Sequence, residues 1–421
     1  MGRKDEKNRR HTHTFILSSV PIVTMAPQVN MLVTDPIEID VFAQVLREST
    51  TRFAIDYCPN ISATELERII HHYDGVVLRS RTKLPRTILE RSHLHYIGRA
   101  GNGYDNIDVA AAQELGIHVD TCPEGSTQSV VELVFGLFIG LARNIVPAHT
   151  ALIQGRWEKE NNLGHELAGK TLGIIGLGVI GSEIALRSHS FDMQLIAHDP
   201  GKTSPHATAL GVSLVSLDEL LLRSDYLTIN VRLTQDTYSL IGRREIALVK
   251  EGVYVVNTAR EQVIDMPALV DAIKGGKVAG YATDVFETEP PAYAHPLLEL
   301  ARDGYPVIVT PHLGAQATEA QRRIAENLGR KTATFFDALA ERHKRKKRKW
   351  GERLSMTQPG LVAAGVLVAF LGIAYAISDP HRCDQEGWDV NYLLPDVMVR
   401  TCPHRSVPGN IPYLFQKKDR R

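Results

Sequence analysis

Three ionisable side chains have the types that hydride transfer at an alcohol carbon requires: Arg260 after VYVVNTA, Glu289 within DVFETEPP, and His312 within VIVTPHLGA. A histidine exchanges a proton near neutral pH, and the planar fork of an arginine matches a carboxylate. A carboxylate beside the histidine would orient it and favour its charged form. Each residue alone would more often be a surface charge or a helix cap. Because all three follow predicted strands in this order, the sequence predicts acid–base chemistry on a small acid.

A glycine-rich turn predicts a dinucleotide site. The run TLGIIGLGVIGSEIALR places Gly176, Gly178 and Gly181 between a predicted strand and a predicted helix. Such glycines allow a tight turn and let the backbone approach a pyrophosphate at the positive end of the helix. Eighteen residues after Gly181, the strand QLIAH is followed by Asp199, which would bind a ribose 2′-hydroxyl and repel a 2′-phosphate. NAD is therefore expected rather than NADP, although Lys202 would soften the preference; a structural turn with a surface aspartate is the alternative.

Short β-branched runs alternate with amphipathic stretches from residue 29 to about 310. The expected strands are NMLVT, GVVLR, HYIG, TLGIIG, QLIAHD, YLTINV, VYVVN, GYATDV and PVIVT. This alternation predicts βαβ units and parallel sheets covered by helices. We expect an α/β fold of two Rossmann-like or flavodoxin-like lobes with a cleft between them, plus an apolar C-terminal helix.

The expected domain organisation has two lobes and several appendages. The segments are a disordered extension at 1–26, a substrate-binding domain at 27–124 that the chain rejoins at 313–340, an NAD-binding Rossmann domain at 125–312, a polybasic linker at 341–359, a candidate transmembrane helix at 360–378 and a tail at 379–421.

Composition argues against several classes of protein. Lys plus Arg equals Asp plus Glu at 48 each, so no global charge points to nucleic acid or to another polyanion. The four cysteines are too few for a disulfide scaffold, and Cys58 and Cys122 have no partner at metal-like spacing. This usage favours a reducing compartment.

The C-terminal region predicts a membrane anchor. Eight basic residues lie in ERHKRKKRKWGER, and the 18 residues 360–377 carry no charge, which approaches the length that crosses a bilayer. Residues 378–397 carry five acids against Arg382 alone, so by the positive-inside rule the body would stay cytoplasmic and the tail would cross. An exported tail would allow Cys383 and Cys402 to pair. A buried core helix and, for KRKKRK, a nuclear signal are the alternatives.

Six motifs carry a resemblance to a known family: RSRTK (79–83), GRAGNGYDNID (98–108), GLGVIG (176–181), VNTAR (256–260), DVFETEP (284–290) and TPHLGA (310–315). Arg260 and Glu289 are 29 residues apart, and Glu289 and His312 are 23 apart, as in that family. Over residues 29 to about 340 the chain resembles the D-2-hydroxyacid dehydrogenases. Within them it looks most like the short forms of D-3-phosphoglycerate dehydrogenase.

The resemblance implies a role for each matching residue. His312 would be the acid–base, Glu289 its partner and Arg260 the substrate anchor, and Asp284 would contact the nicotinamide carboxamide. The other residues expected along the cofactor are Asn102, Gly176, Gly178, Val179, Ile180, Gly181, Asp199, Val231, Thr258, Ala259 and Gly314. The residues expected at the substrate are Arg79, Ser80 and Arg99.

Two further expectations concern charge and assembly. Two guanidiniums, of Arg79 and Arg99, suit a phosphorylated substrate, although an inter-lobe salt bridge is an equal alternative for Arg99. The apolar helix near Val131–Ile145 is expected to link either the two lobes or two subunits, and the resemblance implies a homodimer through it.

Two departures from the family pattern leave the function open. Glu261 and Gln262 replace a pair of glycines, so a carboxylate near the substrate could change its preference or rate. Asn230 and Arg232 replace the histidine and proline of a His-x-Pro motif, which could weaken the cofactor grip or admit a 2′-phosphate. The sequence predicts an NAD-dependent D-2-hydroxyacid dehydrogenase for a 3-phosphoglycerate-like acid. The alternatives are a hydroxypyruvate or glyoxylate reductase, and an NADH-sensing protein that recruits partners.

Overall fold

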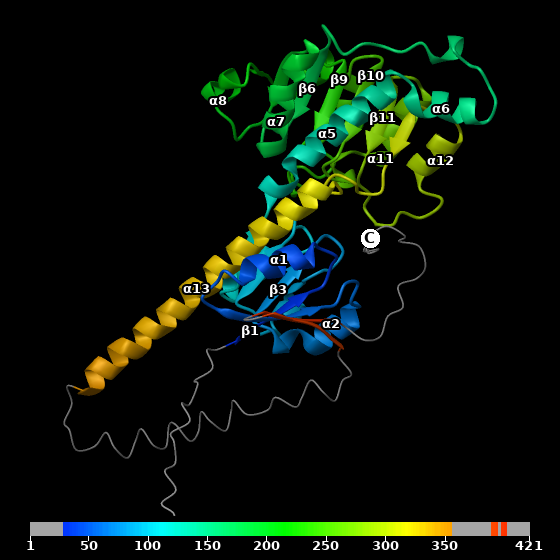
Figure 1. The fold of residues 1–421 in the computed structure, drawn as a ribbon. Coiled ribbons are helices and arrows are strands. Elements are labelled where there is room, and N and C mark those ends of the chain that lie inside the picture. The colour runs from blue at the N-terminus through cyan, green and yellow to red at the C-terminus, as the bar shows by residue number, and fades with distance from the viewer. Residues whose placement is uncertain (1–27, 356–388, 395–396, 402–421) are drawn as a thin grey trace, which may run out of the picture.

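Two β-sheets, one parallel and one parallel except at its β13–β14 edge, lie at the centres of two lobes (Figure 1). The computed structural model describes residues 28–355, 389–394 and 397–401. Successive side chains of a strand point to opposite faces of its sheet. On β6, Ile174 and Ile175 therefore enter two different hydrophobic clusters, one on each face. Strands buried on both faces explain the nearly continuous apolar runs of the sequence.

The first lobe contains a sheet of order β13-β14-β2-β1-β3-β4-β5. Its strands are β1 (Gln28–Val33), β2 (Arg52–Tyr57), β3 (Gly75–Leu78), β4 (Tyr96–Arg99), β5 (His118–Thr121), β13 (Asp389–Leu394) and β14 (Val397–Thr401). The order of β1 to β5 is that of a flavodoxin-like fold. All neighbours are parallel except β13 and β14.

The second lobe contains a parallel sheet of order β12-β11-β10-β9-β6-β7-β8. Its strands are β6 (Thr171–Ile175), β7 (Gln194–His198), β8 (Ser213–Leu214), β9 (Tyr226–Ile229), β10 (Val253–Asn257), β11 (Val278–Thr283) and β12 (Val307–Val309). This is a Rossmann order extended by one strand, and it reverses between β6 and β9, where such folds bind ligands. The predicted α/β fold of two Rossmann-like or flavodoxin-like lobes is confirmed.

Helices follow most strands and cover the sheets. They are α1 (Ile39–Leu46), α2 (Ala63–Ile69), α3 (Arg86–Leu89), α4 (Val109–Glu114), α5 (Pro123–Ala142), α6 (Ile145–Ile153), α7 (Val179–Ser188), α8 (Ser204–Ala209), α9 (Leu217–Arg223), α10 (Arg243–Leu248), α11 (Met266–Lys274), α12 (Pro296–Arg302) and α13 (Thr318–Ser355). Four short 3-10 turns add η1 (Ile70–His72), η2 (Glu160–Asn162), η3 (His189–Phe191) and η4 (Glu261–Val263).

Helix α5 runs between the lobes (Figure 1). By length and composition it is apolar enough to cross a membrane, but most of it is buried inside the protein. Val134, Phe138 and Leu141 pack into the core of the second lobe, and Gly125 approaches Ile324 of α13. Of the two expectations for this helix, the structure shows the link between lobes.

Helix α13 returns to the first lobe and then continues beyond it (Figure 1). Leu328 and Phe336 pack against Phe42 of α1 in the core of that lobe. The helix runs on to Ser355, so much of the segment expected to be a polybasic linker is helical, and residues 341–350 are exposed.

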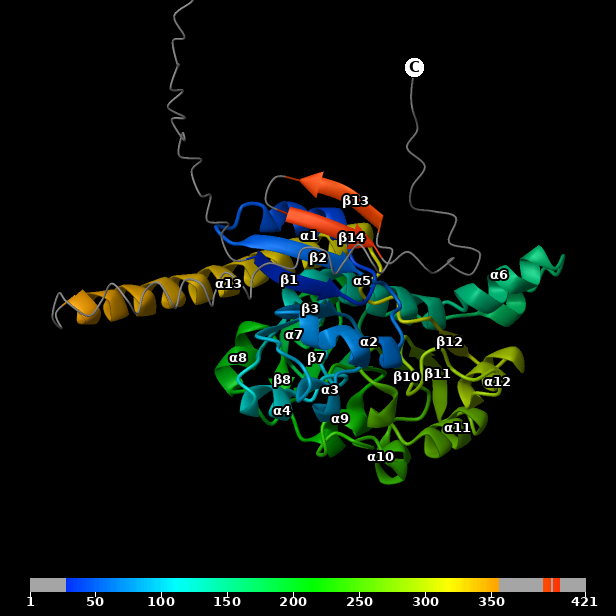
Figure 2. The ribbon, with the colours of Figure 1, turned by 90° about the horizontal axis from the view of Figure 1, so that it is seen from below.

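The strand β14 corrects one expectation about the C-terminal tail. Val397–Thr401 pairs in parallel with β2, in the register Val397↔Phe53 to Thr401↔Tyr57, and β13 pairs with β14 (Figure 2). A strand hydrogen-bonded to the first lobe lies on the same side of any membrane as that lobe. The expectation that the tail crosses is therefore wrong for β13 and β14. The extension 1–26, the apolar segment 360–378 and the pair Cys383 and Cys402 lie outside the described residues.

A matched pair of glycines in α5 tests the helix contact that joins the lobes. A Cβ at Gly125 would lie 2.6 Å from Ile324 Cγ1 and 3.0 Å from Ile324 Cα, whereas a Cβ at Gly136 meets nothing within 4 Å. Gly125→Ala is expected to lower the free energy of unfolding by about 1–3 kcal/mol, because overpacking forces α5 from α13. Gly136→Ala is expected to be neutral or to stabilise by about 0.5–1 kcal/mol. Denaturant unfolding measures both, and equal stability of the two variants would contradict the contact.

Candidate active site

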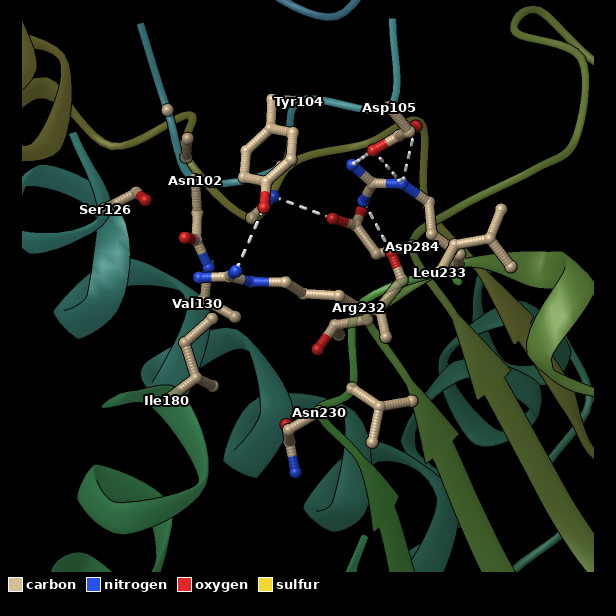
Figure 3. A pocket seen from close by; sticks show the side chains of 18 of the residues that line it. Asn102, Tyr104, Asp105, Ser126, Val130, Ile180, Asn230, Arg232, Leu233 and Asp284 are labelled. Carbon is tan, nitrogen blue, oxygen red and sulfur yellow. Dashed lines mark hydrogen bonds and ion pairs between the residues drawn. The ribbon is translucent and has the colours of Figure 1, made fainter. Parts of the chain in front are cut away.

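A groove between the lobes collects residues from both of them (Figure 3). It encloses about 1070 Å³, part of which is open to solvent. The predicted site residues that line it are Arg99, Asn102, Ile180, Val231, Thr258, Ala259, Arg260, Asp284, His312 and Gly314. Residues that line it without having been predicted as site residues include Tyr104, Asp105, Ser126, Val130, Leu233 and Thr234. Tyr104 and Asp105 stand in a quoted motif, so a signal for them existed.

The glycine turn between β6 and α7 lies beside this groove, because Gly176 approaches Asn230 and Val231, which line it. Gly176 has a φ of 89°, and a Cβ there would lie 2.8 Å from the Asn230 carbonyl oxygen. A Cβ at Gly181 would lie 2.0 Å from the Gly176 carbonyl oxygen, so both positions require glycine. A Cβ at Gly178 would meet nothing within 4 Å. The backbone there is open to a ligand at the N-terminus of α7, where Val179 begins the helix, and this cradle suits a pyrophosphate.

Asp199 lies directly against this turn. It follows β7, and its two carboxylate oxygens accept hydrogen bonds from Leu177 N at 2.8 Å and from Gly201 N at 2.9 Å. Each oxygen still has a lone pair that can accept a hydrogen bond from a ribose hydroxyl. The negative charge of the carboxylate would repel a 2′-phosphate on that ribose.

His312 and Glu289 form a hydrogen-bonded pair. Both Glu289 carboxylate oxygens lie 2.8 Å from His312 Nδ1. With Nδ1 engaged, Nε2 is the ring nitrogen left to exchange a proton with a substrate. His312 adopts a φ of 56°, a left-handed conformation that costs energy for a side chain with a Cβ.

Asp284 at the end of β11 holds the histidine loop in place. Its carboxylate accepts hydrogen bonds from Thr310 Oγ1 at 2.6 Å, Leu313 N at 2.6 Å and Gly314 N at 2.7 Å. Burial raises the pKa of Asp284, although these donors and the nearby His312 act against the increase. The carboxylate thus fixes the residues on both sides of the histidine.

The surroundings of Glu289 keep it ionised. Burial alone would raise the pKa of Glu289, but the hydrogen bond and charge of His312, the Phe286 N–H and the charge of Arg260 together hold the pKa below its usual value. The charged carboxylate can accept a hydrogen bond from Nδ1 and thereby orients the imidazole for proton exchange at Nε2.

Arg260 reaches across the groove to the first lobe. Its Nε lies 3.1 Å from both oxygens of Asp105, and its Nη2 lies 2.7 Å from Oδ1. The guanidinium fork thereby binds a carboxylate in the two-pronged manner that a substrate carboxylate would use. A Cβ at Gly103 would lie 2.0 Å from Arg260 Nη2, so glycine there makes room for the guanidinium.

The predicted substrate residues separate in space. Arg99 at the end of β4 is buried, lines the groove and has an Nε without a partner. Burial, together with the positive charges of Arg260 and Arg79, lowers the pKa of Arg99 to about 10. Among the described residues Arg99 makes no ion pair, so the inter-lobe salt bridge considered for it is not formed there. Arg79 instead binds Gln321 Oε1 at 3.2 Å, and neither Arg79 nor Ser80 lines the groove.

The two departures from the family pattern take different positions. Arg232 lies across the groove, where its guanidinium binds the Tyr104 hydroxyl at 3.1 Å and covers the Tyr104 ring (Figure 3). Glu261 does not line the groove, contrary to the expectation of a carboxylate near the substrate. It is buried and pairs with His295.

Comparison with known proteins identifies the family. Residues 135–314 match the family of D-isomer specific 2-hydroxyacid dehydrogenases in its NAD binding domain. A hydroxypyruvate reductase of Thermotoga maritima is 45% identical over 270 residues, which are 64% of this chain and 87% of that protein. A D-3-phosphoglycerate dehydrogenase of Methanocaldococcus jannaschii is 44% identical over 296 residues, covering 70% of this chain and 55% of that protein. The chain belongs to the family of D-isomer specific 2-hydroxyacid dehydrogenases.

A solved structure shows the same fold. The D-lactate dehydrogenase of Aquifex aeolicus, complexed with NAD and lactic acid, has a TM-score of 0.65 and 27% identity, and the match covers 75% of this chain and 97% of that one. The chain spans only about half the length of the D-3-phosphoglycerate dehydrogenases that it matches.

Asp199 provides a direct test of the cofactor end of the groove. Asp199→Asn keeps an oxygen that accepts from Leu177 N but removes the charge. The ratio of kcat/KM with NADH to that with NADPH is expected to fall about tenfold or more, because a charged hydrogen bond is worth about 1.5–3 kcal/mol. Asp218→Asn, at an exposed aspartate of the same lobe that pairs with Arg244, is the control. An unchanged ratio in Asp199→Asn would contradict the assignment.

Proposed function

We propose that this protein is an NAD-dependent D-2-hydroxyacid dehydrogenase that interconverts a small 2-keto acid and its D-2-hydroxy acid. The observation that carries the proposal is the His312–Glu289 pair, whose histidine lines the groove together with Arg260, beside the glycine turn. Acid, orienting carboxylate and carboxylate anchor are the groups that this reaction needs.

The residues divide the work of reduction. When bound, NADH supplies the hydride that forms the new C–H bond at C2 of the keto acid. His312 Nε2 gives its proton to the keto oxygen, and Glu289 stabilises the imidazolium before that transfer. Arg260 holds the substrate carboxylate, which has to share or displace Asp105. Oxidation reverses each step, and His312 then accepts the hydroxyl proton.

The charges around the groove favour a phosphorylated substrate such as 3-phosphohydroxypyruvate. Arg99 and Arg260 both line the groove, and Arg79 adds its charge to theirs. A buried guanidinium with an unpartnered Nε is costly without an anion, since buried charges require pairing. Hydroxypyruvate or glyoxylate reduction is the alternative, supported by the likeness to a hydroxypyruvate reductase.

A homodimer through α6 fits the distribution of exposed apolar side chains. The inner part of the helix near Val131–Ile145 is covered by the chain itself, whereas α6 projects from the second lobe (Figure 2). Exposed apolar residues on α6 and beyond it are Ile145, Val146, Leu152, Ile153, Trp157 and Leu163. Large apolar side chains that lie exposed close together in the chain favour an interface with another subunit.

The expected location follows from the described cysteines and the basic helix end. Cys58 and Cys122, the two cysteines that the structure describes, are buried and form no disulfide with each other, which suits a reducing compartment such as the cytoplasm. The basic residues at the end of α13 are exposed, and we propose that they bind anionic lipid head groups.

His312→Ala separates catalysis from cofactor binding. Loss of the acid–base group is expected to lower kcat by about 10²–10⁴-fold. The dissociation constant of NADH should stay within about twofold, because the glycine turn and Asp199 are untouched. Steady-state kinetics and fluorescence titration measure the two values. If the protein is instead an NADH-sensing binding module, wild type will turn over no keto acid of a broad panel.

Arg99→Met tests the substrate class. Nicotinamide absorbance is followed with 3-phosphohydroxypyruvate, hydroxypyruvate and glyoxylate, each with NADH and with NADPH. We expect wild type to prefer the phosphorylated acid, and Arg99→Met to lose about 10–100-fold of kcat/KM for that acid alone, as a charged hydrogen bond is removed. Arg81→Met, at an exposed arginine of the first lobe that binds Asn60, is the control. Equal losses on all three acids would contradict phosphate recognition by Arg99.

A further inference from the structure

Glu261 is a buried carboxylate next to the substrate anchor. It directly follows Arg260 in the chain, and only 7% of its surface is exposed. Burying a carboxylate costs several kcal/mol unless hydrogen bonds and an opposite charge compensate it. The partners of Glu261 therefore indicate what this residue stabilises.

Each carboxylate oxygen of Glu261 binds a different segment. Oε1 lies 2.9 Å from His295 Nε2, and Oε2 accepts a hydrogen bond from Glu287 N. His295 in turn accepts a hydrogen bond from Leu297 N through Nδ1, and caps α12. One carboxylate thus joins the turn η4, the loop after β11 and the start of α12.

The loop that Glu261 holds is the loop that carries Glu289. Glu287 is two residues from Glu289, and Phe286 N donates to Glu289 Oε1 at 3.3 Å. The Phe286 ring also packs edge-on against the His295 ring, with 5.1 Å between centroids and an interplanar angle of 90°. The loop that positions the partner of the catalytic histidine is therefore held by two contacts of one largely buried pair: the Glu261 carboxylate binds its backbone, and the His295 ring packs against Phe286.

The other side of Glu261 is fixed to the strand that presents Arg260. Asn257 Nδ2 donates to the Arg260 carbonyl oxygen at 2.9 Å, and Asn257 Oδ1 accepts from Ala259 N at 3.0 Å. The Glu261 side chain extends from this hydrogen-bonded turn to the loop that carries Glu289. It connects the residue that would anchor the substrate to the residue that orients the acid–base.

We propose that Glu261, together with His295, is a positioning residue that fixes the Glu289 loop relative to Arg260 and so sets the orientation of His312. This inference rests on the proposed dehydrogenase function. Glu261 contacts neither the groove nor His312, and its effect passes through Glu287 and Glu289. A carboxylate in place of the glycine that the family pattern has at this position would then support the catalytic pair rather than disturb the substrate.

Substitution of Glu261 tests the proposal through the split between kcat and KM. In Glu261→Ala, kcat is expected to fall about 10–100-fold, as when a residue that orients a functional side chain is removed. The dissociation constant of NADH should stay within about twofold. Glu261→Gln should recover only part of kcat, because its amide oxygen can still accept from Glu287 N while its amide nitrogen faces the Nε2–H of His295.

Glu245→Ala is the matched control. Glu245 is also a largely buried carboxylate of the second lobe, and it accepts a hydrogen bond from Gly242 N at 3.1 Å at the start of α10, away from the groove. Its removal is expected to lower Tm without changing kcat of the folded enzyme. Should Glu261→Ala keep the wild-type kcat, or should both variants lose kcat in proportion to Tm, Glu261 has a structural role only and the proposal is overturned.

The pH profile gives a readout that a structural role would not move. The charged groups that face the His312–Glu289 pair are Asp284 and Arg260, and neither is altered in these variants. When Glu289 is held less firmly, its hydrogen bond to His312 weakens, so the pH dependence of the reduction rate should change in Glu261→Ala and return in part in Glu261→Gln. An unmoved profile in Glu261→Ala would also overturn the proposal.

A second readout separates this inference from the proposed function. If wild type reduces no acid of the panel, the dehydrogenase proposal fails. The positioning role is then judged by the NMR signals of the His312 ring, which should shift in Glu261→Ala and not in Glu245→Ala. Unshifted His312 signals in Glu261→Ala would overturn it.

Discussion

The hydrogen bonds from His312 Nδ1 to both oxygens of Glu289, each 2.8 Å long, are the constraint on which the rest of the site depends. They leave one ring nitrogen for the substrate and keep the carboxylate charged, as the lowered pKa of Glu289 shows. Asp284 fixes the loop of the histidine, and Glu261 binds the backbone of the loop that carries Glu289. Two buried or partly buried carboxylates thus position the pair without touching the imidazole.

Parallel strands explain why residues far apart in sequence meet here. The carboxyl ends of parallel strands lie at one edge of their sheet, and ligands bind outside that edge where the strand order reverses. Arg260, Asp284 and Asp199 all follow strands of the second sheet. The first lobe closes the groove with Arg99 and Asp105, and its position relative to the second lobe is held by α5 and α13.

The sequence predicted the parts of the site that are encoded locally. The glycine turn with Asp199 and the order Arg260, Glu289, His312 depend on short motifs at strand ends. The contacts that decide the charge balance could not be predicted, because they join distant segments: Asp105 lies 155 residues from Arg260 in the chain. The strand β14 was not predicted for the same reason, because it pairs with β2, more than 300 residues away in the chain. The strand β2 was not predicted because RFAIDY contains a buried aspartate that interrupts its apolar pattern.

The central claim is that His312 and Arg260 present C2 of a keto acid to the hydride of NADH. The most direct measurement uses NADH with deuterium at the transferable position of nicotinamide C4, and analyses the product by mass spectrometry and chiral chromatography. The account predicts one deuterium at C2 of a D-2-hydroxy acid. A product without deuterium at C2, or an L-2-hydroxy acid, would contradict it.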